Sequence, residues 1–314
     1  MLRALLKVVL GLVVTVVALI VVGNVFYPEH MAQFAASAER GAAGLERKEI
    51  DIPGFHVVYL DGGQGDPLVL IHGFGADKDN WTRVAKYLTP HYRVIAPDLP
   101  GFGESSKPDS ANYAVKDQVQ YLHTFIQALK LQNVSLGGNS MGGHIVGLYA
   151  ATFPSEVRTL WLVAPAGVAT ADLSELGALI KSGQPNPLLA RTPEDFDHIV
   201  HFVMTDPPYI PGSIKKILAQ RAAANYELHA RIFQELLAAK PDDALEPSLK
   251  GNPVPTRILW GDHDRALSVS GAKILNGLLP NSSVTVMPGI GHLPMIEKPR
   301  QAAEDYLAFR ATVK

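Results

Sequence analysis

Hydrophobic residues follow two patterns along the chain from about residue 49 onward. Short runs of Val, Ile and Leu, each closed by Gly, Pro or Asp, alternate with stretches of helical spacing such as Val119, Leu122 and Ile126. Continuous apolar runs are typical of strands buried on both faces of a parallel sheet. The clearest are Leu68–Ile71, Tyr92–Ala96, Val134–Leu136, Thr159–Val163, Arg257–Trp260 and Val284–Met287. With His56–Leu60 as an opening antiparallel strand, the pattern predicts a mostly parallel, doubly wound α/β fold.

One segment breaks this alternation. From about Val168 to Leu249 the chain shows helical patterns and proline-rich breaks but no convincing strand. Short helices are predicted at Ile199–Val203, Ile214–Ala223 and Leu228–Leu237. Helices inserted between two strands predict a lid over the sheet edge where ligands of open α/β sheets bind. We therefore expect an α/β core over residues 49–167 and 250–314, with a lid over 168–249.

The first 27 residues differ in kind. After Arg3 and Lys7, an uncharged run rich in Val, Leu and Ile reaches the length of about 20 residues that a membrane-crossing helix needs. A cleavable signal peptide is the alternative, but its apolar region spans only about 7–15 residues before a small-residue cleavage site. The nearest such triplet, Ala36-Ser37-Ala38, lies far beyond the run. We predict an uncleaved transmembrane anchor over residues 1–27 and a linker over 28–48.

The charges on either side of this run predict its orientation. Arg3 and Lys7 precede the run, and no Lys or Arg follows it until Arg40. Positive residues favour the cytoplasmic side of a membrane. The N-terminus is therefore expected in the cytoplasm, with the rest of the chain on the non-cytoplasmic, periplasmic side.

Composition narrows the class of function. The chain has 314 residues, of which 47% are hydrophobic and 18% charged, as suits one large globular domain with a small insertion. Its formal net charge is -2, and no run of Lys or Arg could form a phosphate-binding stripe, so nucleic acid is not expected as a partner. The absence of cysteine excludes a disulfide framework, a thiolate nucleophile and a cysteine-ligated metal.

A serine between glycines carries the clearest chemical motif. The sequence GNSMG at residues 138–142 follows the predicted strand Val134–Leu136 and precedes a helical run. A strand, a tight turn and a helix form a nucleophile elbow, in which the glycines keep Cβ atoms out of the turn. Ser140 would be the nucleophile, and Gly138 and Gly142 the turn glycines. The alternative for this motif alone is a glycine-rich turn with an incidental serine.

A second glycine-rich turn, HGFG at residues 72–75, closes an earlier strand. Enzymes with a nucleophile elbow use such a turn to supply the second hydrogen-bond donor of the oxyanion hole. We expect the backbone N–H groups of Phe74 and Met141 to be these donors, with Gly73 as a turn glycine. The alternative is an ordinary strand-end turn. His72 itself is expected to bind backbone groups rather than to react.

The partners of the serine must follow in the order acid, then histidine. The loop WGDHD after Arg257–Trp260 offers Asp262 and Asp264. The third position after the glycine carries the acid in similar sequences, which favours Asp264 and leaves Asp262 to shape the turn. His292, in the loop GIGH, is the only histidine downstream of the acids. A solvent-exposed loop histidine is the alternative for His292.

The remaining histidines are given structural or surface roles. His263 is expected to point to solvent, and His123 and His144 to pack on helices. His198 and His201 have the spacing of a metal pair, but no third ligand is evident near them. Neither a metal nor another cofactor is expected.

From about residue 50 to its end the chain resembles the α/β-hydrolase superfamily. The motifs HGFG, DLPGFGES at residues 98–105, GNSMGG, LWGDHD and GIGH occur in that family's order. The segments HGFGADKDNW and GNSMGG are similar to the corresponding segments of membrane-associated bacterial lipases and monoacylglycerol lipases. The resemblance also assigns Asp98 and Gly103 to a loop that frames the active-site entrance, without a chemical role.

The resemblance implies a carboxylic ester hydrolase that acts on lipids through Ser140, Asp264 and His292 and an acyl-enzyme. Epoxide hydrolases and haloalkane dehalogenases carry aspartate in place of Ser140, which argues against both. A carbon–carbon bond hydrolase or an amidase with the same triad is an alternative, and a binding module without catalysis is another.

Overall fold

The computed structural model describes residues 2–313, except the side chains at positions 4, 13, 16–21 and 213. One eight-stranded sheet forms the centre, in the order β1-β2-β4-β3-β5-β6-β7-β8. β1 and β2 are antiparallel to their neighbours, and the strands from β4 to β8 along the sheet are parallel. The strands are β1 Leu45–Ile52, β2 Phe55–Gly62, β3 Pro67–Ile71, β4 Arg93–Pro97, β5 Val134–Ser140, β6 Val157–Pro165, β7 Thr256–Gly261 and β8 Ser282–Met287. The predicted mostly parallel α/β sheet is confirmed.

Each face of the sheet carries its own hydrophobic core. Successive side chains of a strand point to opposite faces, so Val69 and Ile71 of β3 lie in one core and Leu68 and Leu70 in the other. The first core holds residues of α4 Val115–Ala128, α5 Met141–Thr152, α10 Leu245–Leu249 and α11 Ser270–Leu278. The second holds residues of α3 Thr82–Leu88, α12 Pro294–Glu297 and α13 Pro299–Thr312. The fold is therefore doubly wound.

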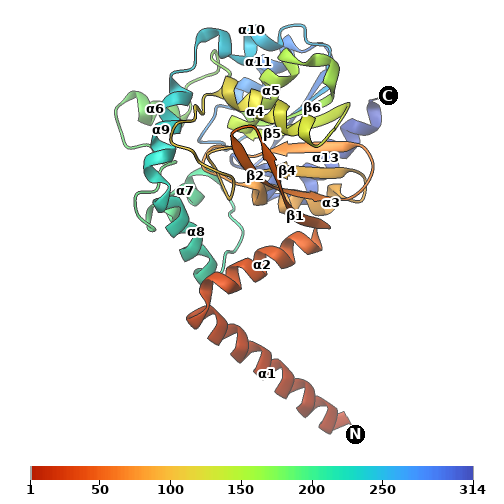
Figure 1. The fold of residues 1–314 in the computed structure, drawn as a ribbon, viewed down its shortest axis with the longest axis vertical. Coiled ribbons are helices and arrows are strands. Elements are labelled where there is room, and N and C mark those ends of the chain that lie inside the picture. Colours follow the sequence, from red (N-terminus) through yellow and green to blue (C-terminus); the bar gives the residue numbers. More distant parts are fainter. Residues whose placement is uncertain (1, 314) are drawn as a thin grey trace.

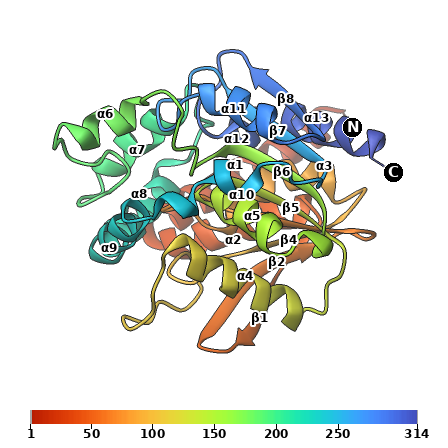
Figure 2. The ribbon, with the colours of Figure 1, turned by 90° about the horizontal axis from the view of Figure 1, so that it is seen from above.

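Helices without strands fill the interval between β6 and β7. They are α6 Glu175–Lys181, α7 Asp195–Val203, α8 Gly212–Ala224 and α9 Tyr226–Leu237, followed by the short 3₁₀ turn η3 Pro241–Asp243 and α10. Figure 2 shows α6 to α9 gathered on one side of the sheet. This is the interval in which the sequence predicts the lid, and the name lid is kept below for α6 to α9 and the loops that join them.

Two helices precede the sheet. α1 Leu2–Phe26 extends away from the rest of the chain, and α2 Pro28–Ala42 connects it to β1 and packs against α8 (Figure 1). Within the part of the chain that the structure describes, no helix is long and apolar enough to cross a membrane. The transmembrane helix predicted over residues 1–27 is therefore not found, and the side chains at 16–21 within it lie outside the described residues.

The start of the sheet also differs from expectation. Residues 28–48, for which the sequence predicts a linker, form α2 and the first residues of β1. β1 lies at the edge of the sheet, and most of its side chains are exposed. β1 could not be predicted from the sequence, because its polar residues Glu46 to Glu49 interrupt any apolar run.

Candidate active site

Ser140 lies at the sharp turn between β5 and α5. Its backbone has φ 56° and ψ -120°, a conformation that non-glycine residues rarely adopt. Strain of this kind persists only where the surrounding structure holds it, and it clusters at functional sites. The half-buried Ser140 side chain has no hydrogen-bond partner among the residues that the structure describes. The backbone at Ser140 therefore has the sharp turn that the sequence predicts for a nucleophile elbow.

The glycines around Ser140 allow backbone segments to approach closely. A Cβ atom on Gly138 would lie 2.3 Å from the carbonyl oxygen of Gly142. One on Gly142 would lie 2.2 Å from the carbonyl oxygen of Ile71, at the end of β3. Both contacts are far shorter than any real Cβ contact, so a side chain at either position would force the turn apart. Each glycine predicted from the motif has a steric reason.

The turn HGFG lies directly beside Ser140. A Cβ atom added to Gly73 would come within 3.1 Å of the Cβ atom of Ser140. The N–H of Phe74 has no hydrogen-bond partner among the described residues. Met141 is the first residue of α5, so its N–H has no acceptor within the helix. Two free N–H groups therefore lie on backbone segments that flank the serine.

His72 holds this turn in place as a neutral ring. The N–H of Leu99 donates to Nε2 of His72 over 3.0 Å, and Nδ1 lies 2.8 Å from the carbonyl oxygen of Gly73. Because Nε2 accepts a hydrogen bond, Nδ1 carries the proton and donates to Gly73. Complete burial lowers the pKa of His72 to about 4. The prediction that His72 binds backbone groups is confirmed.

Asp264 and His292 form a close pair. Nδ1 of His292 lies 2.7 Å from Oδ2 of Asp264, and the side chains are 6% and 0% exposed, respectively. An ionised carboxylate only accepts hydrogen bonds, so Nδ1 carries the proton and Nε2 is left as a base. The two residues come from the loops after β7 and β8, as the sequence predicts.

Three further donors hold the Asp264 carboxylate. The N–H groups of Ala266 and Leu267 donate to Oδ1 over 2.8 and 2.9 Å. Nε1 of Trp260 donates to Oδ2 over 3.0 Å. With His292, these groups satisfy both oxygens of a buried charge, as burial in a protein requires. The orientation of the carboxylate is thus fixed before any substrate arrives.

The alternative acid, Asp262, faces away from this pair. Its Oδ1 accepts a hydrogen bond from the N–H of Gly289 over 2.7 Å, and it lies 2.6 Å from Nδ1 of His263. His263 is exposed, as predicted. Asp262 therefore braces the loop after β8, which is the turn-shaping role that the sequence gives it.

The backbone of His292 is fixed from two sides. Its carbonyl oxygen accepts a hydrogen bond of 3.1 Å from Nδ2 of Asn139, the residue before Ser140. Its N–H donates to the carbonyl oxygen of Val203, at the end of lid helix α7, over 2.8 Å. The histidine loop is therefore bound both to the strand that carries the serine and to the lid.

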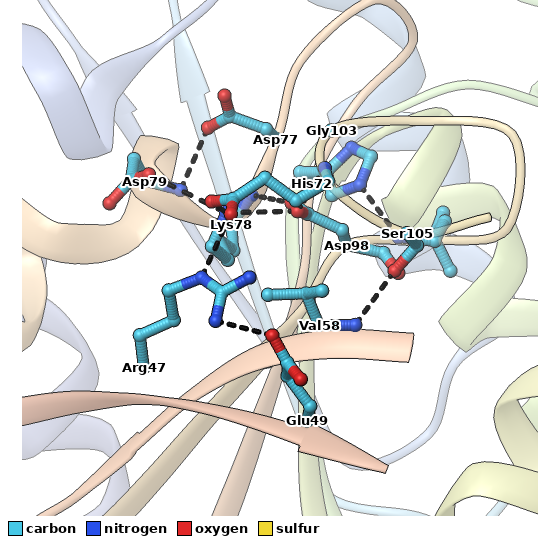
Figure 3. Close-up of polar contacts among 12 residues, drawn as sticks. Arg47, Glu49, Val58, His72, Asp77, Lys78, Asp79, Asp98, Gly103 and Ser105 are labelled. Atoms are coloured by element: carbon cyan, nitrogen blue, oxygen red, sulfur yellow. Dashed lines mark hydrogen bonds and ion pairs between the residues drawn. The ribbon is translucent and has the colours of Figure 1, made fainter. Parts of the chain in front are cut away.

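A buried charge network around Lys78 and Asp98 lies close to His72 (Figure 3). Lys78, two residues after Ala76, is 1% exposed, and its Nζ lies 2.9 Å from Asp98 and 2.6 Å from Glu104. Burial alone would lower the pKa of Lys78, but the surrounding carboxylates, chiefly Asp98, raise it above its ordinary value. Lys78 thus stays charged. The side chain of Asp98 also accepts hydrogen bonds from the N–H groups of Lys78 and Glu104.

The same network explains the loop motif at residues 98–105. Oγ of Ser105 donates to the carbonyl oxygen of Asp98 and accepts from the N–H of Val58 (Figure 3). Gly103 has a positive φ, and a Cβ atom there would lie 2.2 Å from Cγ of Asp98. Asp98 and Gly103 therefore shape this loop. The structure gives them a supporting role, consistent with the absence of a chemical role in the prediction.

His123 and His144 pack within the fold, whereas His198 and His201 are exposed on α7. The ring of His123 stacks on Phe153 with centroids 4.1 Å apart, and Nε2 of His144 lies 2.5 Å from the carbonyl oxygen of Asp243. Nδ1 of His201 lies 2.8 Å from the carbonyl oxygen of Asp197, in its own helix. Over the described residues, no group of three or more His, Cys, Asp or Glu side chains could hold a metal ion.

Sequence reasoning misses several residues around this site. Asn139 lies inside the recognised motif, yet nothing local shows that its amide reaches His292, which is 153 positions away. Trp260 appears only as a strand residue, although its indole N–H binds Asp264. Glu297 follows His292 by five positions, and its spacing from the histidine is the only signal that could have drawn attention to it.

Comparisons with known proteins agree with the α/β fold. A family model described as alpha/beta hydrolase fold matches residues 66–299. Lipase 1 of Psychrobacter immobilis is 40% identical over 282 residues, which cover 88% of this chain and 87% of the lipase. Monoacylglycerol lipase ABHD6 of Mus musculus is 32% identical over 263 residues, covering 80% and 77%. The crystal structure of a membrane phospholipase A, titled a novel bacterial virulence factor, has 42% identity and a TM-score of 0.89, covering 100% of this chain and 99% of that one.

Proposed function

Because the chain belongs to the α/β-hydrolase fold family, we propose that it hydrolyses carboxylic esters of lipids, with Ser140 as nucleophile, His292 as base and Asp264 as its orienting acid. The observation that carries this proposal is the hydrogen bond between Asp264 and His292, in a loop that Asn139 ties to the strained turn at Ser140. Relatives named lipase and monoacylglycerol lipase support a lipid ester as the substrate class.

Acylation follows from these residue types. A serine hydroxyl is a weak nucleophile at neutral pH, so Nε2 of His292 accepts its proton as Oγ of Ser140 bonds to the ester carbonyl carbon. The carbonyl oxygen becomes an oxyanion, which the N–H groups of Phe74 and Met141 stabilise. Each such donor contributes about 3–4 kcal/mol of transition-state stabilisation. His292 then gives the proton to the leaving alcohol as the ester C–O bond breaks.

Deacylation repeats the same steps with water. His292 accepts a proton from a water molecule, whose oxygen attacks the carbonyl carbon of the acyl-Ser140. The tetrahedral intermediate again uses the two N–H donors. When the bond to Oγ breaks, the proton returns to Ser140 and the carboxylic acid leaves. Asp264 stays ionised throughout and stabilises the imidazolium of His292.

Aromatic side chains beside the oxyanion turn favour an apolar acyl group. The ring of Phe74 packs against Phe102, His229 and Phe233, at centroid distances of 5.2 to 6.0 Å. His229 and Phe233 belong to lid helix α9. The lid therefore places apolar surface next to the proposed oxyanion donors, where an acyl chain would find a matching environment.

Hydrolysis of p-nitrophenyl esters from acetyl to palmitoyl, together with a monoacylglycerol, tests this proposal. The wild-type protein is expected to hydrolyse esters, and Ser140→Ala to lose that activity while keeping its unfolding midpoint. Folded wild-type protein that hydrolyses no ester would refute the proposal. Turnover of anionic dienones without turnover of any ester would instead favour the carbon–carbon bond hydrolase.

The proposal extends to location: α1 holds the enzyme at a membrane. The described side chains of α1 include exposed Leu2, Leu5, Leu6, Val8 and Leu10, on a helix that extends away from the domain (Figure 1). Insertion of residues 1–27 across the membrane, with the catalytic domain on the periplasmic side, stays a prediction from the sequence. Flotation of the full chain with lipid vesicles, but not of a chain lacking residues 1–27, is the expected result. Equal flotation of both chains would contradict membrane attachment through α1.

A further inference from the structure

A buried carboxylate next to the histidine loop takes no part in the steps above. Glu297 is the last residue of α12 and is 8% exposed. Its Oε1 accepts a hydrogen bond of 2.9 Å from the N–H of Gly291, the residue before His292. Its Oε2 accepts hydrogen bonds from the N–H groups of Thr205 and Asp206 over 2.8 and 2.9 Å. One side chain therefore joins the histidine loop to the lid segment that follows α7.

Neighbouring contacts strengthen this junction. The N–H of His292 donates to the carbonyl oxygen of Val203, and Nζ of Lys298 lies 3.0 Å from Oδ2 of Asp206. A Cβ atom on Gly291 would lie 2.8 Å from the carbonyl oxygen of Val203 and 3.0 Å from Oε1 of Glu297. The histidine loop and the lid segment 203–206 are thus packed together without room for a side chain between them.

The chemistry of the junction makes it selective for a carboxylate. Hydrogen bonds from N–H groups to an ionised acceptor are shorter and stronger than those to a neutral one. Only a side chain with two acceptor oxygens can serve both segments without presenting a donor to an N–H group. Removing the Glu297 carboxylate leaves three N–H groups of the two segments without their acceptor. The histidine loop can then shift, and a displacement of about 1 Å at a reacting group can lower the rate about 10²-fold.

We infer that Glu297 is a positioning residue that clamps the His292 loop to the lid segment Thr205–Asp206 and so sets the orientation of the imidazole toward Ser140. The inference deepens the proposed function and rests on it. It also assigns the end of α7 to the fixed part of the lid, because the clamp binds that end to the catalytic loop. A change in lid position at Thr205 would be transmitted to the His292 loop through this carboxylate, beside the direct hydrogen bond from His292 to Val203.

The test compares Glu297→Gln with Glu246→Gln in the full chain, using p-nitrophenyl butyrate. Glu246 is a matched control, because its carboxylate also accepts a backbone N–H bond, from Thr170, but does not touch the histidine loop. Glu297→Gln is expected to lower kcat by about 10- to 100-fold with KM within about threefold of wild type. Its rate of reaction with a fluorophosphonate should fall by a similar factor. Glu246→Gln should keep both rates.

Glu297→Ala provides an ordering that a purely structural role would not give. Gln keeps one oxygen acceptor, so activity per folded molecule should decrease from wild type to Glu297→Gln to Glu297→Ala. If the alanine variant does not fold, Glu297→Gln alone decides. A folded Glu297→Gln variant with kcat within about twofold of wild type would overturn the inference. If Ser140→Ala retains ester hydrolysis, the proposed function fails. If Ser140→Ala is inactive but Glu297→Gln is fully active, the clamp fails and the proposed function stands.

Discussion

Asn139 and His292 are joined by a hydrogen bond of 3.1 Å, from the side-chain amide of one to the backbone carbonyl of the other. The same amide donates to the carbonyl oxygen of Val163 in β6 over 3.1 Å. Asn139 therefore connects the strand that presents Ser140, its neighbour in the sheet and the histidine loop. The relative position of nucleophile and base depends on this side chain.

Asn139→Ala is expected to lower both stability and activity. Two buried carbonyl groups lose their donor, which should cost about 1–3 kcal/mol in the free energy of unfolding. Loss of the link to His292 should lower kcat by at least about 10-fold. Urea unfolding and ester hydrolysis measure the two effects. Asn252→Ala, which removes an amide bonded to Ala150 far from the site, should reduce stability without reducing kcat; an Asn139→Ala variant with wild-type kcat would contradict this role.

Replacement of the two neighbouring aspartates separates their roles. Asp264→Asn keeps the size of the side chain but removes its charge and replaces one acceptor oxygen with an NH₂ donor, so the histidine tautomer is no longer fixed and kcat should fall by about 10⁴-fold. Asp262→Asn should keep activity close to wild type, because Asp262 contacts Gly289 and His263 instead of His292. Steady-state kinetics on a short-chain ester decides between them. The reverse order of effects would make Asp262 the acid.

Replacing the buried Lys78 is expected to destabilise the fold strongly. Lys78→Met leaves Asp98 buried without its cation, which should lower the free energy of unfolding by about 3–5 kcal/mol. Lys116, whose exposed ammonium pairs with Asp243, provides the control, and Lys116→Met should lower the free energy of unfolding far less than Lys78→Met does. Urea denaturation at neutral pH measures both variants. Equal losses in the two variants would show that burial of the Lys78 pair carries no special weight.

The buried side chain of His229 is expected to make the free energy of unfolding depend on pH. Burial, with smaller effects of Lys107 and His72, lowers the pKa of His229 from 6.5 to about 4, so the folded chain resists protonation. The unfolded chain binds this proton below about pH 6.5, and stability is therefore lost as pH falls from about 6.5 to about 4. His229→Phe should weaken that loss, since phenylalanine fits the contacts with Phe74 and Phe102 without titrating. Urea midpoints at pH 7.5 and 5 test this, and an unchanged difference between the two pH values would contradict it.

Local sequence was enough to predict the elements that carry the site. The apolar runs that form β3 to β7 are buried on both faces of the sheet, so each is visible without knowledge of its neighbours. The run that forms β8 differs from expectation, because β8 lies at the sheet edge and only Met287 of its residues is buried. Ser140, Asp264 and His292 each lie in a short glycine-containing motif directly after such a strand. Their order along the chain then gave each its expected role, and the structure brings Asp264 and His292 into contact.

The residues that position the site could not be predicted in the same way. Asn139, Trp260 and Glu297 act through contacts with segments remote in sequence or through donors that face a loop, and neither periodicity nor composition reveals such contacts. Glu297 illustrates this, because its oxygen partners are Gly291, six positions away, and Thr205, 92 positions away. The edge strand β1 escaped prediction for a different reason, since its exposed polar face lacks the apolar pattern that marks a strand.

Covalent labelling of the intact protein with a fluorophosphonate tests the central claim most directly. Mass spectrometry of the digested adduct should locate a single modification on Ser140, and ester hydrolysis should disappear in proportion to labelling. Ser140→Ala should show neither the adduct nor hydrolysis, and Asn281→Ala, a surface variant near β8, should show both. An adduct on another residue that accounts for the loss of activity, or full ester hydrolysis by Ser140→Ala, would contradict the assignment of Ser140 as the nucleophile.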